Sequence, residues 1–80
     1  MRIPIVMPQL GYEMTSGRLV GWLKRVGEPV ARGDLIAEVE TEKTTVGMEA
    51  TDSGTLVEVV HEAGAEVPVG DVIGWLDDGA

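Results

Sequence analysis

Short apolar segments alternate with glycine-containing turns along the chain. Five of these segments are rich in valine, isoleucine, leucine or tryptophan, and they cover residues 19–23, 35–39, 45–50, 56–60 and 72–76. Such runs at regular spacing predict the strands of an all-β sandwich or flattened barrel. Residues 3–7 add an edge-type strand, because Pro4 cannot donate to a central ladder. A helix over residues 58–65 is the alternative, although no convincing helical period supports it.

The chain contains an internal repeat, in which residues 17–39 resemble residues 54–76 at an offset of 54 − 17 = 37. Two copies are too few for a solenoid. We therefore expect the two units to pack on each other as two sheets related by a pseudo-twofold axis. The chain between the copies then turns at one end of the body, and the termini meet at the other. The matched positions include Gly17 with Gly54, Leu19 with Leu56, Gly27 with Gly64, Gly33 with Gly70 and Asp34 with Asp71.

The segment between the copies is a predicted hairpin with a wholly polar tip at residues 41–44. Alternation before and after the tip predicts one buried face, with Ile36 on the outer face. Lys43 should then point into solvent, where it suits modification better than catalysis, because a catalytic lysine needs desolvation to lower its pKa. The predicted buried face consists of Leu35, Ala37, Val39, Val46, Met48 and Ala50.

The length and composition of the chain limit the functions that it can have. Eighty residues predict a single domain over 1–80, with 77–80 as a tail or the start of a linker. The net charge of -8 argues against nucleic acid or an anionic membrane as partner and favours a basic protein surface. The start lacks the features of a secretion signal, and no apolar run approaches the roughly 20 residues of a spanning helix.

Catalytic chemistry has few candidates in this chain. The absence of cysteine excludes a disulfide, a thiolate metal site and a cysteine nucleophile, so redox chemistry would need an attached cofactor. Ser16 and Ser53 lack a nucleophile-elbow context. The single His61 has no second His or Cys with which to form a metal site. We therefore predict a non-catalytic domain without a metal.

Three segments together resemble a lipoyl domain of the dihydrolipoyl acyltransferase component of a 2-oxoacid dehydrogenase complex: MPQLGYEMTSGRLVGWL, VGEPVARGDLIAEVETEKTT and GTLVEVVHEAGAEVPVGDVIGWL. The resemblance runs from about Ile3 to Leu76. It implies a flattened barrel or sandwich of two four-stranded antiparallel sheets with quasi-twofold symmetry. Lys43 matches the lysine of the family's E-[ST]-[DE]-K-[AT] hairpin, which carries lipoic acid in amide linkage. Glu42 and Thr44 match the residues through which that hairpin is recognised.

The resemblance implies a carrier function. Lipoate ligase or a lipoyl transferase would load Lys43. A thiamine diphosphate-dependent decarboxylase would acylate the lipoyl group reductively, the acyltransferase core would pass the acyl group to coenzyme A, and dihydrolipoyl dehydrogenase would reoxidise the arm. The start of the chain is more similar to domains of pyruvate or acetoin complexes than of the 2-oxoglutarate type. Such complexes imply bacterial or archaeal cytoplasm or the mitochondrial matrix.

Partner recognition is implied for the loop after the first strand, which lies beside the modified lysine in the family. By match this role falls to Leu10, Gly11, Tyr12 and Glu13, and we add Glu40 beside the hairpin. The chain departs from the family at Gly47, where many members have an acidic residue four positions after the lysine. We expect this departure to affect partner or ligase preference and not the fold.

Two other functions stay open. A biotin carrier shares the fold, but its lysine lies between two methionines, whereas Lys43 lies between Glu42 and Thr44. From a different class, an unmodified acidic module could dock a basic partner through Glu38, Glu40 and Glu42.

Overall fold

The computed structural model describes residues 1–11, 13–41 and 44–79. All regular structure in these residues is β-strand, which confirms the predicted fold class. The segment considered as a helix, 58–65, instead ends one strand and continues as a turn. No helix in the described part of the chain is long and apolar enough to cross a membrane. The strands are β1 (Arg2–Val6), β2 (Ser16–Trp22), β3 (Pro29–Val30), β4 (Leu35–Glu40), β5 (Thr45–Glu49), β6 (Gly54–Val59), β7 (Glu66–Pro68) and β8 (Val72–Asp77).

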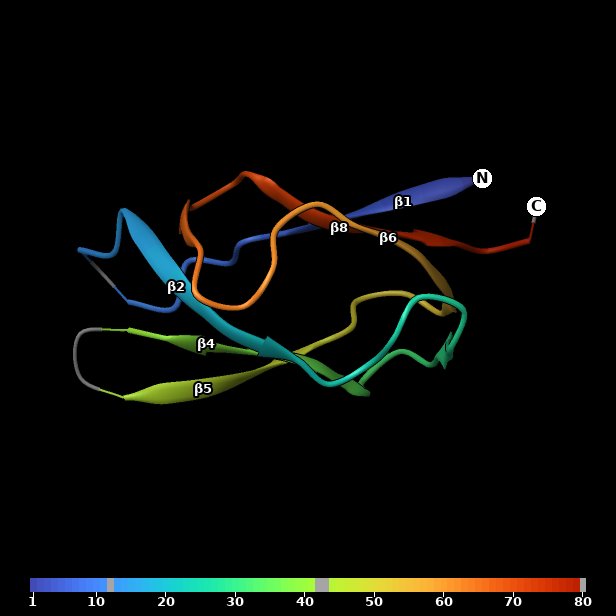
Figure 1. Ribbon diagram of the computed structural model, residues 1–80, viewed down its shortest axis with the longest axis horizontal. Helices are drawn as coiled ribbons and strands as arrows, with labels where there is room; N and C mark the ends of the chain where they lie inside the picture. Colours follow the sequence, from blue (N-terminus) through green and yellow to red (C-terminus); the bar gives the residue numbers. More distant parts are fainter. Residues whose placement is uncertain (12, 42–43, 80) are drawn as a thin grey trace.

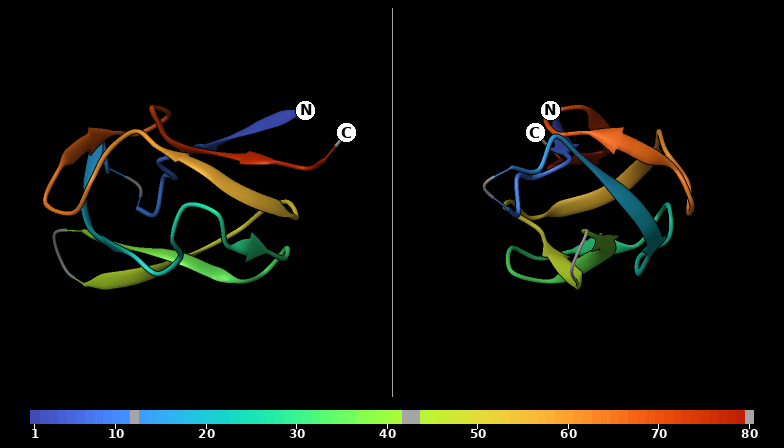
Figure 2. Two further views of the ribbon diagram at one scale, coloured as in Figure 1. Left: turned by 45° about the vertical axis from the view of Figure 1, so that its right-hand side comes forward. Right: turned by 90° about the vertical axis from the view of Figure 1, so that its left-hand side faces the viewer.

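The strands form two antiparallel four-stranded sheets that face each other (Figures 1 and 2). One sheet has the order β1-β8-β6-β3 and the other has the order β5-β4-β2-β7. The body measures 37 × 20 × 18 Å and is a flattened sandwich, not a closed barrel. β1 is an edge strand, as Pro4 predicts.

The two copies of the repeat interleave and do not form one sheet each. The first copy contains β2, β3 and β4, and the second contains β6, β7 and β8. Each sheet takes its short edge strand from the other copy, since β3 pairs with β6 and β7 pairs with β2. Exchanging β1 with β5, β8 with β4, β6 with β2 and β3 with β7 converts one strand order into the other. The pseudo-twofold relation predicted from the sequence is therefore confirmed.

The backbone hydrogen bonds between the copies repeat the same symmetry. Gly27 N–H donates to the Leu56 carbonyl, and Gly64 N–H donates to the Leu19 carbonyl, each at 2.7 Å. Both glycines adopt positive φ, 99° and 94°, a conformation that other residues rarely adopt. These two turns fasten each copy to a strand of the other.

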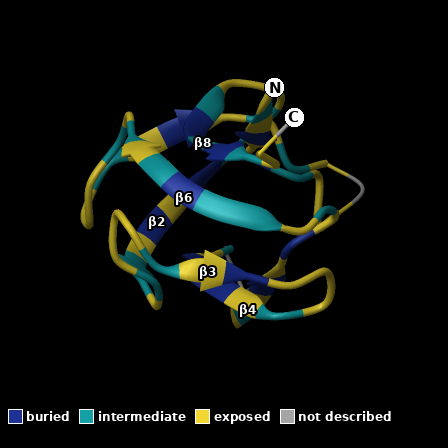
Figure 3. Cartoon of the chain, turned by 90° about the vertical axis from the view of Figure 1, so that its right-hand side faces the viewer, coloured by how far each residue is buried: buried dark blue, intermediate teal, exposed yellow. Residues whose placement is uncertain are grey.

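The core lies between the sheets and, in the described part of the chain, consists of thirteen buried apolar residues from all eight strands and the adjoining loops (Figure 3). The predicted buried face of the central hairpin is correct at Ala37, Val39, Met48 and Ala50, and Val46 is partly buried. It is wrong at Leu35, which is 52% exposed, and at Ile36, which is 1% exposed. The cause is a bulge between Leu35 and Ala37 in the pairing of β4 with β5, which shifts the alternation by one residue.

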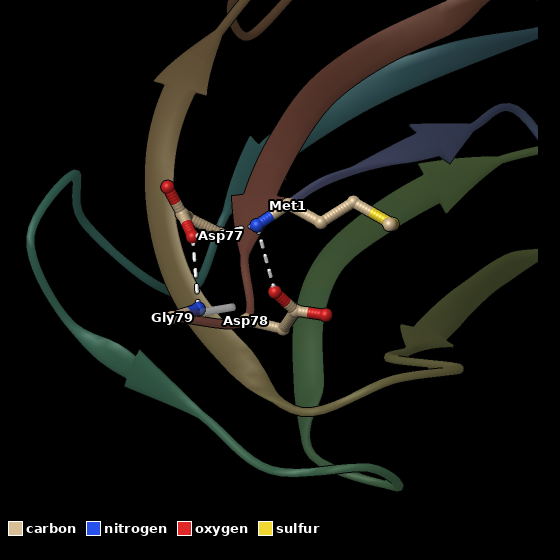
Figure 4. Close-up of polar contacts among 4 residues, drawn as sticks. All are labelled: Met1, Asp77, Asp78 and Gly79. Atoms are coloured by element: carbon tan, nitrogen blue, oxygen red, sulfur yellow. Dashed lines mark hydrogen bonds and ion pairs between the residues drawn. The ribbon is translucent and has the colours of Figure 1, made fainter.

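The two ends of the chain lie together, as predicted, at the end of the body opposite the β4–β5 tip (Figure 1). The Met1 ammonium contacts carboxylate oxygens of Asp78 at 3.0 Å and Asp77 at 3.6 Å (Figure 4). Asp77 belongs to β8, and the Gly79 N–H donates to its side chain at 2.8 Å. Residues 77–79 are thus joined to the body through these contacts.

The paired termini are the symmetry-related copy of the hairpin closure. Asp78 N–H donates to the Met1 carbonyl at 3.1 Å, and Thr41 N–H donates to the Thr44 carbonyl at 2.8 Å. Asp78 and Thr41 follow the equivalent strands β8 and β4, and Met1 and Thr44 precede the equivalent strands β1 and β5. The two hydrogen bonds therefore occupy equivalent positions in the two sheets. The body therefore has two equivalent ends, and the continuous chain turns at only one of them.

The terminal ion pairs predict a small dependence of stability on pH. The hydrogen bond to Asp78 raises the pKa of the Met1 ammonium above its ordinary 8.0. A raised pKa means that the contribution is fully present below about pH 8 and is lost as the pH rises through the folded-state pKa. We expect the melting temperature to fall between pH 7 and pH 10 by more in this chain than in Asp78→Asn. An equal fall in both proteins would contradict the assignment.

At acidic pH the dependence of stability on pH has the opposite sign, because the contribution of Asp77 is lost as the pH falls. The Gly79 N–H, followed by the nearby ammonium, holds the pKa of Asp77 below its ordinary 3.8. Its contribution is present above that ordinary value and is lost as the pH falls through the lower, folded-state pKa.

Candidate functional site

The central hairpin is closed at its tip by one threonine. The last cross-strand pair is Glu40 with Thr45. Beyond it, Thr41 Oγ1 donates to the Thr44 carbonyl at 3.0 Å and accepts from the Thr44 N–H at 3.3 Å. These bonds add to the Thr41 N–H bond described above, so the backbone on both sides of the tip is fixed. Sequence reasoning missed this role of Thr41, which the side-chain capacity of threonine in turns could have indicated.

The predicted attachment site lies in the sequence between the two threonines that close the hairpin. Glu42 and Lys43 are the two residues between Thr41 and Thr44, and they lie outside the described residues. Thr44 is described and exposed. β4 and β5 reach the tip at one end of the long axis of the body (Figure 1). The described part of the hairpin thus ends at one end of the molecule.

Glu40 pairs with a residue that the sequence did not single out. Arg18 lies opposite Glu40 in the pairing of β2 with β4, and their side chains approach to 3.6 Å. Both side chains are about half exposed, so this pair contributes little to stability, about 0–1 kcal/mol. The pair places the positive charge of Arg18 beside Glu40, at the end of β4 next to the hairpin tip.

The loop after β1 breaks the symmetry of the body. Met7 and Ala50 occupy equivalent positions, because Met7 N–H donates to the Asp71 carbonyl at 2.9 Å and Ala50 N–H donates to the Asp34 carbonyl at 2.8 Å. Asp34 and Asp71 are themselves a matched pair of the repeat. The segments that follow Met7 and Ala50 can therefore be compared directly.

The first of these segments is six residues longer. Residues 8–16 separate Met7 from the next matched glycine, whereas residues 51–53 separate Ala50 from its counterpart. The longer loop lies at the same end of the body as the hairpin tip (Figure 1). Leu10, Gly11 and Glu13 are exposed on it, and Tyr12 lies outside the described residues. The structure thus brings the predicted recognition loop and the hairpin to one end of the molecule.

A methionine fixes this loop to the body. The half-buried Met14 packs against the core, and its Sδ accepts the Leu10 N–H at 3.2 Å. Gly17 makes room for it, since a Cβ at this position would lie 2.7 Å from Met14 Cε, 2.9 Å from Val39 Cγ1 and 3.1 Å from Met7 Sδ. The side chain of Met14 therefore fills the space that Gly17 leaves open.

Gly47 also has a local structural role. A Cβ on Gly47 would lie 2.9 Å from Leu35 Cδ2, because the bulge in β4 turns the Leu35 side chain outward and across β5. Leu35 thus covers the position at which many lipoyl domains carry an acidic side chain.

The other lysine of the chain is placed differently. Lys24 lies near the opposite end of β4, where its ammonium approaches Asp34 Oδ2 at 3.7 Å. Its side chain is 24% exposed. An amine held in this way does not suit a freely reaching arm, which leaves Lys43 as the candidate.

Comparison with known proteins agrees with this geometry. The family model for biotin and lipoyl domains, described as "Biotin-requiring enzyme", matches residues 3–76. The chain belongs to the biotinyl/lipoyl carrier family. This family membership confirms the resemblance seen in the sequence. Within the family, the names of the curated relatives indicate lipoyl domains.

Two curated relatives are acyltransferase components. The dihydrolipoyllysine-residue acetyltransferase component of the acetoin cleaving system of Bacillus subtilis is 40% identical over 78 residues, which cover 98% of this chain and 20% of that protein. A mitochondrial component of the pyruvate dehydrogenase complex of Arabidopsis thaliana is 49% identical over 70 residues, covering 86% of this chain and 13% of that protein. The carrier domain thus spans a fifth or less of the length of these relatives.

A solved structure matches the carrier domain over its whole length. The lipoyl domain of the 2-oxoglutarate dehydrogenase complex from Azotobacter vinelandii superposes with a TM-score of 0.77 and 32% identity, covering 98% of this chain and 99% of that one. The two-sheet fold predicted from the sequence is therefore the fold of a lipoyl domain.

Proposed function

We propose that this domain carries lipoic acid in amide linkage on Lys43 and serves a 2-oxoacid dehydrogenase complex. The observation that carries the proposal is the closed, polar hairpin at one end of the body, in which Thr41 and Thr44 flank Glu42 and Lys43 in the sequence. The names of the relatives support the lipoyl group over biotin. The sequence agrees, because Glu42 and Thr44 flank the lysine in place of two methionines.

The chemistry of the chain fits this cofactor. The protein has no cysteine and so offers no thiol of its own. When bound, lipoic acid supplies a dithiolane that accepts electrons and an acyl group. The chain itself supplies the amine to which the cofactor is joined, in a hairpin that Thr41 and Thr44 close by hydrogen bonds. Holding the arm close to successive active sites raises its effective concentration there.

Partner recognition is assigned to the hairpin end of the body. Lipoate ligase or a lipoyl transferase would recognise Glu42 and Thr44 on either side of the lysine. The decarboxylase would contact Leu10, Gly11, Tyr12 and Glu13 of the long loop together with Glu40. The six additional residues of this loop support that assignment, because they distinguish the hairpin end from its symmetry-related counterpart.

The remaining partners follow from the same carrier role. They are the thiamine diphosphate-dependent decarboxylase, the acyltransferase core and dihydrolipoyl dehydrogenase. The domain itself would be non-catalytic and would work in bacterial or archaeal cytoplasm or in the mitochondrial matrix. It would act without nucleic acid or a membrane as partner, in keeping with its net charge of -8.

The proposal is tested by loading the purified domain in parallel reactions. One reaction contains lipoate, ATP and lipoate ligase, and the other contains biotin, ATP and biotin ligase. We expect a single lipoyl adduct and no biotin adduct by intact mass. A biotin adduct alone would assign the domain to the biotin carriers, and no adduct in either reaction would favour an acidic docking module.

The substrate of the complex is identified in a second step. The lipoylated domain is offered to the thiamine diphosphate-dependent enzymes that act on pyruvate, on acetoin or on 2-oxoglutarate, and reductive acylation is followed by mass. We expect the pyruvate or acetoin enzyme to react fastest, because the start of the chain is more similar to those domains. Faster reaction with the 2-oxoglutarate enzyme would overturn this preference.

A further inference from the structure

The long loop at the hairpin end depends on one thioether. Met14 is the only described side chain between Pro8 and Thr15 that packs against the core. Its sulfur accepts the Leu10 N–H, and its own N–H donates to the Gly11 carbonyl at 3.2 Å. The exposed part of the loop is therefore fastened through Met14 both to the body and to itself.

The four methionines differ sharply in exposure. Met7 and Met48 are 1% and 8% exposed in the core, whereas Met1 is 73% exposed at the far end of the body. Met14 lies between these extremes, since it is half-buried at the surface of the core. A small oxidant can reach a half-buried sulfur, and oxidation follows exposure. Met14 is thus more exposed than the two core methionines, Met7 and Met48.

We propose that Met14 is an oxidation site that controls the position of the loop beside the hairpin. The oxidant is a peroxide. A lone pair of Met14 Sδ attacks one oxygen of hydrogen peroxide, the O–O bond breaks, and the second oxygen leaves as hydroxide. The oxygen now bonded to sulfur gives up its proton, which converts the hydroxide into water. The sulfur loses two electrons and gains one S–O bond, and the peroxide is reduced by the same two electrons. Methionine sulfoxide reductases reverse the change.

The sulfoxide is larger and more polar than the thioether that it replaces. The added oxygen lies on the same sulfur that now accepts the Leu10 N–H at 3.2 Å. On its other side the methyl group fills the space over Gly17, where even a Cβ would come within 2.7 Å. Oxidation also turns an apolar side chain into a polar one, which disfavours burial. The oxidised side chain therefore moves outward and takes the loop with it.

The functional consequence rests on the proposed function. If the decarboxylase recognises the loop, oxidation of Met14 slows reductive acylation of the lipoylated domain. Attachment of the lipoyl group depends on the hairpin, so it changes less. Met14 acts here as a positioning residue, because it holds Leu10 and Gly11 and does not itself meet the substrate.

The structural part is tested without any partner enzyme. The folded chain is treated with hydrogen peroxide, and each methionine is quantified by peptide mass mapping. We expect Met14 to oxidise faster than Met7 and Met48, and the Leu10 amide to exchange with deuterium roughly tenfold faster afterwards, the loss expected for one hydrogen bond. Treatment with the reductases should restore slow exchange. Oxidation of Met14 no faster than that of Met7, or unchanged Leu10 exchange in the oxidised protein, would overturn the proposal.

The functional part uses Met14→Leu as the matched variant. Leucine keeps an apolar side chain of similar volume, so the variant should fold. It cannot form a sulfoxide. We expect peroxide to lower the rate of reductive acylation severalfold in the parent domain and not in Met14→Leu, with reductase restoring the parent rate. An equal loss in both proteins would assign the effect to another residue and overturn the regulatory role. A lipoylated domain that no decarboxylase acylates even before oxidation would contradict the proposed function instead, while the exchange result would stand.

Discussion

Replacing Lys43 by arginine should abolish attachment of lipoic acid completely. Arginine keeps the positive charge at the tip, but its guanidinium does not lose a proton in proteins and cannot supply a neutral amine for acylation. The fold should be unaffected, because the hairpin is closed by Thr41 and Thr44 on either side. Loading of the variant by lipoate ligase is measured by intact mass.

The matched control is Lys24→Arg, which changes the only other lysine of the chain. Lys24 is paired with Asp34 away from the tip, and arginine can keep that pairing. We expect this variant to be loaded as fully as the parent. A lipoyl adduct on Lys43→Arg, or loss of loading in Lys24→Arg, would place the attachment site on Lys24.

Replacing Gly54 by alanine should give the largest loss of stability among single-methyl additions. A Cβ on Gly54 would lie 2.6 Å from the Asp77 carbonyl oxygen and 3.0 Å from its carbon. These are backbone atoms of a paired strand, so they cannot move aside as a flexible side chain would. We expect a loss of about 1–3 kcal/mol in the free energy of unfolding, as for other overpacked sites. Urea denaturation monitored by circular dichroism measures it.

The control for this substitution is Gly21→Ala. Gly21 lies in β2, where the pairing of β2 with β4 shifts register. A Cβ on Gly21 would meet no atom within 4 Å. Alanine also restricts the unfolded chain more than glycine does, so we expect no loss and a gain of up to about 1 kcal/mol. If both substitutions destabilise equally, the close approach of Gly54 to Asp77 is not what limits stability.

The repeat made much of the fold predictable. Glycines at matched positions, such as Gly27 and Gly64, indicated equivalent turns, and both adopt positive φ. The exchange of β3 and β7 between the sheets was not predictable, because strands of two and three residues carry too little alternation to read. The outward turn of Leu35 was missed for a related reason. A bulge inserts a residue without a sequence signal of its own and reverses the faces that alternation predicts.

The candidate site was predictable to a different degree. Lys43 stood out because it lies in a polar tip between two apolar strands, and the resemblance to lipoyl domains gave that position its chemistry. The contacts around it could not be derived in the same way. The Arg18–Glu40 pair joins strands far apart in the sequence, and the Met14 sulfur bond depends on the space above Gly17. To predict either contact, one must know how β2 is aligned with its neighbouring strands in three dimensions.

The proposed carrier role depends on lipoic acid attached to Lys43. The most direct measurement is peptide mapping by mass spectrometry of the protein purified from its native host, without added ligase. We expect one lipoyl group, located on the peptide that contains Lys43, and an unmodified Lys24. A Lys43 that is unmodified throughout, or that carries biotin, would contradict it.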